Sequence, residues 1–155
     1  MRLWCRQIFV LLCLLPLLSG CLSTKPVLPT SDQQALGSFT VSSPSLGQTL
    51  LVPSSCAAGD RQFFLGADFE DKGSGLVLRL VVDPLEGPAV RVFTTAAPFD
   101  NSIVFRRNDC KIFHFSLDTT GWRINRIYDY RITLQLDCSR NGEAIQGNAS
   151  ATHCH

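Results

Sequence analysis

From residue 38 onwards the chain consists of short runs in which apolar and polar side chains alternate. The clearest run spans residues 130–138, where every second residue is apolar: Tyr130, Ile132, Leu134, Leu136 and Cys138. Alternation with a period of two is typical of a β-strand with one buried face. Residues 76–82 have the same pattern, but Arg79 interrupts the second face, which predicts a central strand with one side partly in water.

Turn residues separate these runs at regular intervals. The segment 83–88 (Asp-Pro-Leu-Glu-Gly-Pro) and the dipeptide Asn141-Gly142 are strong turn signals. No window of helical length after residue 21 has a sustained apolar period of 3.6 residues. The pattern therefore predicts an all-β fold, an antiparallel β-sandwich or partly open barrel of about seven to nine strands. Among sandwich packings we expect the aligned one.

The N-terminal segment has a different pattern. Arg2 and Arg6 precede an uncharged, leucine-rich run at residues 8–18, which ends in Leu18-Ser19-Gly20-Cys21. A basic start, a short apolar centre and small residues are typical of an export signal. The run has about a dozen residues, whereas a helix needs roughly twenty to cross a bilayer. A transmembrane anchor is thus disfavoured, and an ordinary secretory signal cut near Gly20 is the main alternative.

The order Leu-Ser-Gly-Cys resembles the lipobox of bacterial lipoproteins. In that class the cysteine thiol is diacylated, the signal is cut before the cysteine, and the new amino terminus is usually acylated too. The resemblance implies lipidation at Cys21 and a membrane as the first partner, because two or three acyl chains anchor a protein firmly. It places the protein in the bacterial cell envelope. Leu22, in place of the aspartate that favours inner-membrane retention in enteric-type sorting, favours the outer membrane.

The whole chain is therefore predicted to have three parts. Residues 1–21 form the lipoprotein signal with its lipid-acceptor cysteine, and the proline- and hydroxyl-rich residues 22–37 predict a flexible tether. Residues 38–155 are long enough for one β domain with a substantial core.

The charge balance gives no sign of a nucleic-acid partner. The chain has 14 basic and 13 acidic residues. Removal of the signal takes Arg2 and Arg6 away, which leaves 12 basic against 13 acidic residues and a net charge of −1. Nucleic-acid binding requires a clearly basic face or arm.

Four cysteines lie after the lipid site: Cys56, Cys110, Cys138 and Cys154. An even number in an exported protein predicts two disulfides. If Asn141-Gly142 closes a tight hairpin, about eleven residues at about 3.3 Å each separate Cys138 from Cys154, far beyond the roughly 6 Å that a disulfide allows between α-carbons. If residues 110–117 pair antiparallel with 131–138, Cys110 lies level with Cys138, and Cys56 is left for Cys154.

We expect the protein to bind neither a metal nor a cofactor, although two groups of residues resemble metal ligands. His153 and His155 flank Cys154 as alternate strand residues, but two ligands without a third or fourth make a weak site; exposed histidines beside a disulfide are the simpler interpretation. The acidic loop with Asp68, Glu70 and Asp71 lacks the spacing of a calcium loop, and a solvated turn explains it.

Nucleophilic catalysis has little support, and we expect no enzyme. His114, Ser116 and Asp118 share one strand face, but alternate residues of a strand lie about 7 Å apart, too far for direct hydrogen bonds. The chain has no Gly-x-Ser-x-Gly motif.

Arginines and aromatic residues gather in one part of the chain, and both are residue types that anchor protein interfaces. We expect Trp122 to be the most exposed of them, because it falls in a long connection between residues 118 and 129. The alternative is an aromatic cap over a loop with ordinary surface arginines. The candidate interaction residues are Arg106, Arg107, Trp122, Arg123, Arg126 and Tyr128, with Lys111, Arg131 and Tyr130 nearby.

These observations predict an envelope lipoprotein with one disulfide-bonded β domain that acts as a non-catalytic binding or structural module. Its partner would be another envelope protein, a glycan or a component of a secretion assembly. The first alternative is a periplasmic enzyme inhibitor, since small disulfide-bonded β lipoproteins that block lysozymes exist. The second is a hydrolase of envelope material. A deep pocket lined by His114 and carboxylates would favour this alternative.

Overall fold

The structure is a computed structural model that describes residues 34–96 and 102–155. All of them belong to one compact unit, Ser31–His155. The export-signal segment, the lipid-acceptor candidate Cys21 and residues 22–33 of the expected tether lie outside the described residues. None of the helices in the described part of the chain is long and apolar enough to cross a bilayer.

In the described residues, ten antiparallel strands form two open sheets of five, so the predicted antiparallel β-sandwich is confirmed. The first sheet has the order β2-β1-β10-β9-β8. Its strands are β1 (Ala35–Ser43), β2 (Gly47–Leu51), β8 (Cys110–Ile124), β9 (Ile127–Arg140) and β10 (Glu143–Cys154).

The second sheet has the order β3-β4-β5-β6-β7. Its strands are β3 (Ser55–Ala58), β4 (Gly66–Asp71), β5 (Leu76–Asp83), β6 (Gly87–Thr94) and β7 (Ile103–Arg106). Two short 3₁₀ helices, η1 (Gly59–Gln62) and η2 (Arg107–Asp109), follow β3 and β7. The short β3 is the strand that the hydrophobic pattern did not predict.

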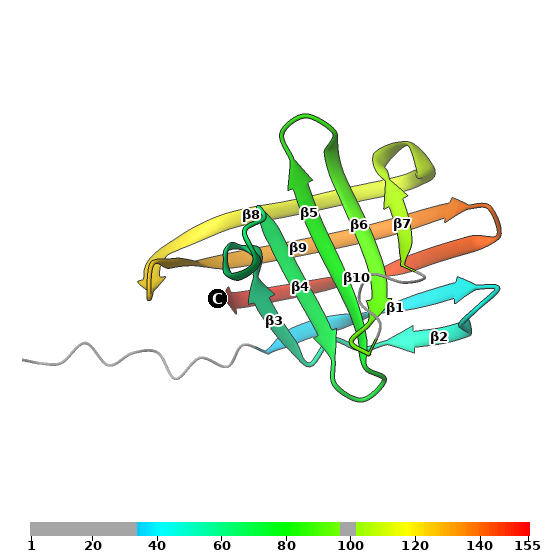
Figure 1. The fold of residues 1–155 in the computed structure, drawn as a ribbon, viewed down its shortest axis with the longest axis horizontal. Coiled ribbons are helices and arrows are strands. Elements are labelled where there is room, and N and C mark those ends of the chain that lie inside the picture. The colour runs from blue at the N-terminus through cyan, green and yellow to red at the C-terminus, as the bar shows by residue number, and fades with distance from the viewer. Residues whose placement is uncertain (1–33, 97–101) are drawn as a thin grey trace, which may run out of the picture. The chain divides into compact units, whose positions relative to one another are not determined.

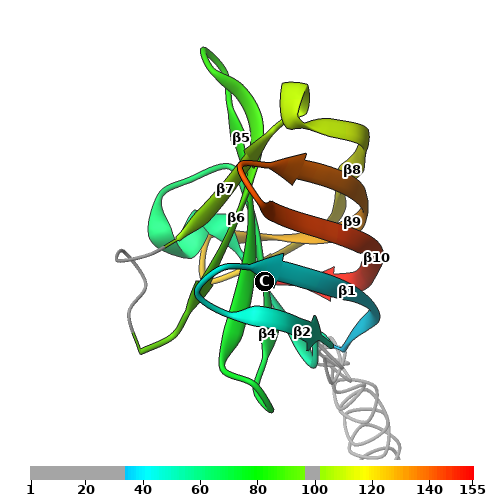
Figure 2. The same cartoon turned by 90° about the vertical axis from the view of Figure 1, so that its right-hand side faces the viewer.

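The two sheets pack face to face, and their strands cross at a steep angle (Figures 1 and 2). This corrects the expected aligned packing. The chain changes sheet twice through short corners, at residues 52–54 and 107–109. Such corners are typical of sheets that pack across one another.

The core lies between the sheets and receives the alternate residues that the sequence predicted. Strand β9 buries the whole alternating set of residues 130–138, and Ile132, Leu134 and Leu136 are at most 2% exposed. The second sheet contributes Phe69, Leu78, Leu80 and Phe105 to the same core; each is fully buried. Burial of such side chains is the main favourable term in folding.

Both disulfides have the pairing that the hairpin argument favoured. Cys110 pairs with Cys138 across β8 and β9. Cys56 pairs with Cys154 and joins β3 of the second sheet to β10 of the first. The first bridge therefore reinforces one sheet, whereas the second ties the two sheets together.

Two expected boundaries differ from the structure. Strand β1 begins at Ala35, so the last three residues of the expected tether pair with β10. The apolar run at residues 62–69, which its hydrophobic pattern predicts to be one strand, is divided, because η1 and a turn occupy its first part and β4 starts only at Gly66. The backbone at Phe63 is left-handed, with φ of 63°, which ends η1.

Candidate functional site

The β8–β9 hairpin carries four of the predicted interaction residues. Residues 118–129 were expected to form a long connection, but both strands continue through this segment and only Asn125 and Arg126 form the turn. Their φ angles are 52° and 71°, as a two-residue hairpin turn with the twist of β-strands requires. Gly121, with φ of 88°, lies within a register shift between Thr119 and Arg123. Such an irregularity bends and twists a strand.

We call Trp122, Arg123, Arg126 and Tyr128 the hairpin tip. Trp122 is 46% exposed and Tyr128 is 36% exposed. Arg123 pairs in register with Tyr128, and its guanidinium lies 3.8 Å from the centre of the tyrosine ring. A stacked arginine of this kind keeps its donors free at the ring edge while it is held in one orientation. The tip therefore presents ordered aromatic and cationic groups to solvent.

Arg106 and Arg107 do not belong to this surface. They lie beside Cys110, at the other end of β8, and the strand can extend about 40 Å between Cys110 and Arg123. Arg106 forms an ion pair with Glu86, with 2.7 Å between nitrogen and oxygen. Arg107 donates a hydrogen bond to the Phe113 carbonyl. The predicted interaction residues thus divide into two groups that share a strand but not a site.

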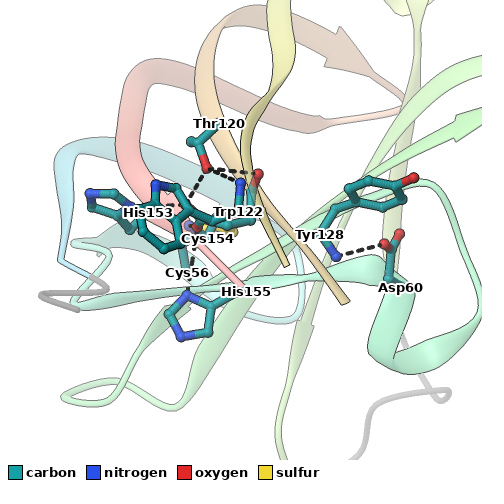
Figure 3. A network of polar contacts seen from close by, with 9 residues as sticks. Cys56, Asp60, Thr120, Trp122, Tyr128, His153, Cys154 and His155 are labelled. Carbon is teal, nitrogen blue, oxygen red and sulfur yellow. Dashed lines mark hydrogen bonds and ion pairs between the residues drawn. A yellow bond between two sulfur atoms is a disulfide. The ribbon is translucent and has the colours of Figure 1, made fainter. Parts of the chain in front are cut away.

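Asp129 lies at the base of the hairpin tip and is almost completely buried, with 2% of it exposed. Its Oδ2 accepts a hydrogen bond from the Thr120 hydroxyl at 2.6 Å and lies 2.9 Å from His153 Nδ1. Its Oδ1 accepts the Cys154 amide at 3.0 Å and lies 3.6 Å from His155 Nδ1. Figure 3 shows the partners Thr120, His153, Cys154 and His155 gathered beside the Cys56–Cys154 disulfide.

This environment favours the charged form of Asp129. Burial raises the pKa of the Asp129 carboxyl, but the hydrogen bonds from Thr120 and His153, the charge of His153 and the Cys154 amide together outweigh burial. The net result is a pKa below the ordinary value. Hydrogen bonds to a carboxylate stabilise its ionised form in this way. Asp129 therefore works as a charged clamp that holds β8, β9 and β10 together.

A second carboxylate holds the hairpin from the side of the other sheet. Both oxygens of Asp60, in η1, lie 3.2 Å from the Tyr130 hydroxyl, and one accepts the Tyr128 amide at 3.4 Å (Figure 3). Burial, together with the charge and the hydrogen bond of Asp60, raises the pKa of Tyr130 to about 12. Tyr130 is therefore a protonated donor at neutral pH, and the base of the hairpin tip is fixed to both sheets.

The two C-terminal histidines have different surroundings from those expected. His155 is buried, with 8% of it exposed, and His153 is half-buried; both face Asp129 instead of standing free beside the disulfide. In the described ranges 34–96 and 102–155, no three histidine, cysteine or acidic side chains are grouped so that they could hold a metal ion.

The acidic residues Asp68, Glu70 and Asp71 do not lie in a solvated turn, as expected, but in strand β4; the exposed turn at residues 72–74 follows them. Asp71 is buried and accepts hydrogen bonds from the amides of Val52, Gly73 and Ser74 and from the Ser74 hydroxyl. Asp68 forms an ion pair with Arg79. These carboxylates bind protein donors and shape the turn.

His114, Ser116 and Asp118 are not joined by hydrogen bonds. The Ser116 hydroxyl pairs instead with the Thr133 hydroxyl on β9, at 2.8 Å. His114 and Ser116 line a shallow hollow of about 510 Å³ whose other polar groups are hydroxyls and amides. The carboxylates that the hydrolase alternative calls for do not line this hollow.

The sequence pattern singled out the four residues of the hairpin tip as interaction candidates, but not the groups that support them, namely Asp60, Thr120 and Asp129. The sequence contains only a weak signal for these groups. Asp129 directly precedes the alternating residues 130–138, and because Tyr130 faces inward, the alternation predicts that Asp129 is exposed. Comparisons of the chain with protein-family models, with curated proteins and with solved structures gave no match.

Proposed function

We propose that this protein is a lipid-anchored lipoprotein of the bacterial envelope, on the outer membrane, whose β domain is a non-catalytic binding module. The proposed anchor is Cys21, at the end of the lipobox-like segment. The two disulfides support an oxidising compartment, because structural disulfides form mainly in exported proteins.

The observation that carries the binding function is the rigid hairpin tip. Trp122 and Tyr128 are exposed, and Arg123 is stacked on Tyr128. Tryptophan, tyrosine and arginine dominate the energetics of protein interfaces. The clamps at Asp129 and Asp60 order the tip before a partner arrives, which lowers the entropy lost on binding. An acidic groove on an envelope protein has the chemistry that this surface fits.

The inhibitor alternative is favoured by the shape of the same element. The β8–β9 hairpin extends past β3, the edge strand of the second sheet, so its end projects beyond that sheet (Figure 1). A projecting, preordered hairpin can enter the cleft of an enzyme, whereas a flat sheet face cannot. The two functions share the surface and differ only in the partner.

Site-specific photocrosslinking in living cells tests the proposal. One variant carries p-benzoylphenylalanine at Trp122, and a control carries it at Leu85, a 94% exposed residue in the β5–β6 turn. We expect a discrete adduct at position 122 that Arg123→Ala weakens, and no such adduct at position 85. Equal crosslinking at both positions, or none at position 122, would contradict the proposal. If the captured partner is an enzyme, loss of its activity on addition of the purified lipoprotein distinguishes inhibition from simple binding.

A further inference from the structure

The second sheet has a pocket on its outer face, away from the core. The cavity measures about 380 Å³ and lies over β3 to β6, within the size range of small-ligand sites. Its apolar part is formed by Val77 and Phe93, which pair in register on β5 and β6. These residues are only 5% and 7% exposed, although they lie outside the main hydrophobic core.

One of the two arginines in this pocket is fully engaged. Arg79 forms two parallel hydrogen bonds to Asp68, at 2.7 and 2.8 Å, and donates a third to Gln62. Its guanidinium also lies 4.6 Å from the centre of the Phe64 ring and 5.2 Å from that of Phe93. Arg79 is therefore charge-compensated and held in one orientation.

The other arginine is not compensated. Arg91 lies directly opposite Arg79 in the register of β5 and β6, is half-buried, and lines the same pocket. Within the part of the chain that the structure describes, its guanidinium has no hydrogen-bond or ion-pair partner. Like charges opposite one another destabilise a sheet, and a partly desolvated cation without an acceptor adds to this cost. Such a residue is typical of a site that is completed by an anionic ligand.

The other charges in the pocket define the class of anion. Asp68 and Glu70 line it together with the two arginines, so the four side chains carry no net charge. Asp68 neutralises Arg79, and Glu70 accepts a hydrogen bond from the Ser55 hydroxyl and, among the described side chains, forms no ion pair with Arg91. Arg91 is therefore the cation that remains for a ligand. With Glu70 in the same pocket, it can compensate a single negative charge, whereas the carboxylates repel a dianion such as phosphate. The planar guanidinium matches a carboxylate through two parallel hydrogen bonds.

We infer that this pocket binds a monocarboxylate attached to an apolar group, with Arg91 on the carboxylate and Val77 and Phe93 against the apolar part. The carboxyl-terminal apolar residue of a peptide has this chemistry, and so does a free acylated amino acid. The site is on the sheet that does not carry the hairpin tip, and it depends neither on that surface nor on the lipid anchor.

The test measures the affinity of the purified full-length protein for three probes by calorimetry or ligand-observed NMR. N-acetyl-leucine carries the expected groups, N-acetyl-leucinamide lacks the charge, and inorganic phosphate lacks the apolar part. A short peptide ending in leucine is compared with N-acetyl-leucine to distinguish the two sources of the carboxylate. We expect N-acetyl-leucine or the peptide to bind, and the amide and phosphate to bind at least about tenfold more weakly, as loss of a charged hydrogen bond predicts.

Arg91→Gln is the decisive variant, and Arg131→Gln on the exposed face of β9 is its charge-matched control. We expect Arg91→Gln to weaken carboxylate binding by about tenfold or more, with a melting temperature no lower than that of the native protein, because the repulsion with Arg79 is relieved. The control should keep native affinity. Binding that survives in Arg91→Gln, equal binding of acid and amide, or no detectable carboxylate binding would overturn the inference.

Discussion

Asp129 and His153 lie on neighbouring strands, with Asp129 Oδ2 only 2.9 Å from His153 Nδ1. The pair stands at the point where the hairpin tip, the last strand and the intersheet disulfide meet. Its arrangement resembles the base and orienting carboxylate of a catalytic group, but the Thr120 hydroxyl bonds to the carboxylate and not to the imidazole. We therefore interpret the pair as a structural clamp under the hairpin tip.

The clamp predicts acid-sensitive stability. Because the pKa of Asp129 is lower in the folded protein, the unfolded chain binds more protons near its ordinary pKa of about 3.9. The stabilisation is thus present above that pH and is lost as the pH falls through the folded pKa. We expect Asp129→Asn to lower the free energy of unfolding at neutral pH by about 1–3 kcal/mol, because buried donors lose their acceptor, and to flatten its pH dependence. Denaturant unfolding at a series of pH values measures both.

The control for this experiment is Asp118→Asn, at an exposed position on β8. It should leave the stability and its pH dependence unchanged. The Asp129→Asn variant should keep some acid sensitivity, because Asp71 also has a lowered pKa. Burial raises the pKa of Asp71, but four hydrogen bonds to its carboxylate outweigh this effect. A pH profile identical to that of the native protein would contradict the role of Asp129.

The raised pKa of Tyr130 allows an independent test of the Asp60 contact at alkaline pH. The chain has two tyrosines, so Tyr128→Phe leaves Tyr130 as the only phenol. We expect it to titrate near pH 12 in the folded protein, against about 10 in an unfolded chain. The unfolded state releases its proton first, so stability should fall as the pH rises above about 10. Spectrophotometric titration measures the pKa, and Asp60→Asn should lower it by removing the carboxylate charge.

The two disulfides should contribute unequally. In the chain-entropy model, a bridge across 98 residues is worth about 4.7 kcal/mol and one across 28 residues about 3.6 kcal/mol. Only the Cys56–Cys154 bridge joins the sheets. We therefore expect the double serine variant at Cys56 and Cys154 to be less stable than that at Cys110 and Cys138, and full reduction to lower the melting temperature further. Thermal unfolding of the three samples checks this, and the reverse order of stability would be inconsistent with it.

The fold was largely predictable because a strand with one buried face leaves a period-two pattern in the sequence. The Asn141-Gly142 turn fixed the register of β9 and β10, and that register decided which cysteines could meet. Strand β3 escaped prediction because it has only four residues and two of them are alanines. The crossing of the sheets depends on corner geometry, which leaves no periodic signal.

The candidate site was predictable only on its surface. Exposed Trp122 and Tyr128 stand out by residue type, but the pattern predicted a long connection over residues 118–129, where the strands in fact continue through a register shift and a tight turn. Asp129 and Asp60 are 69 positions apart, and each is defined by partners that only the folded sheets bring together. Ordinary strand alternation assigns Asp129 to the exposed face. The irregularity between Ala151 and Cys154, which lies opposite the neighbouring residues 130–132, is not encoded locally.

Mass spectrometry of the N-terminal peptide of the mature protein, purified from its own envelope, is the most direct test of the proposed lipoprotein. We predict that the peptide begins at Cys21 and carries a thioether-linked diacylglyceryl group, with an additional acyl chain on the amino terminus. The same peptide from a Cys21→Ser strain should lack all acyl mass, and that protein should leave the membrane fraction. A mature chain that begins elsewhere, or an unmodified Cys21 in membrane-bound protein, would contradict the account.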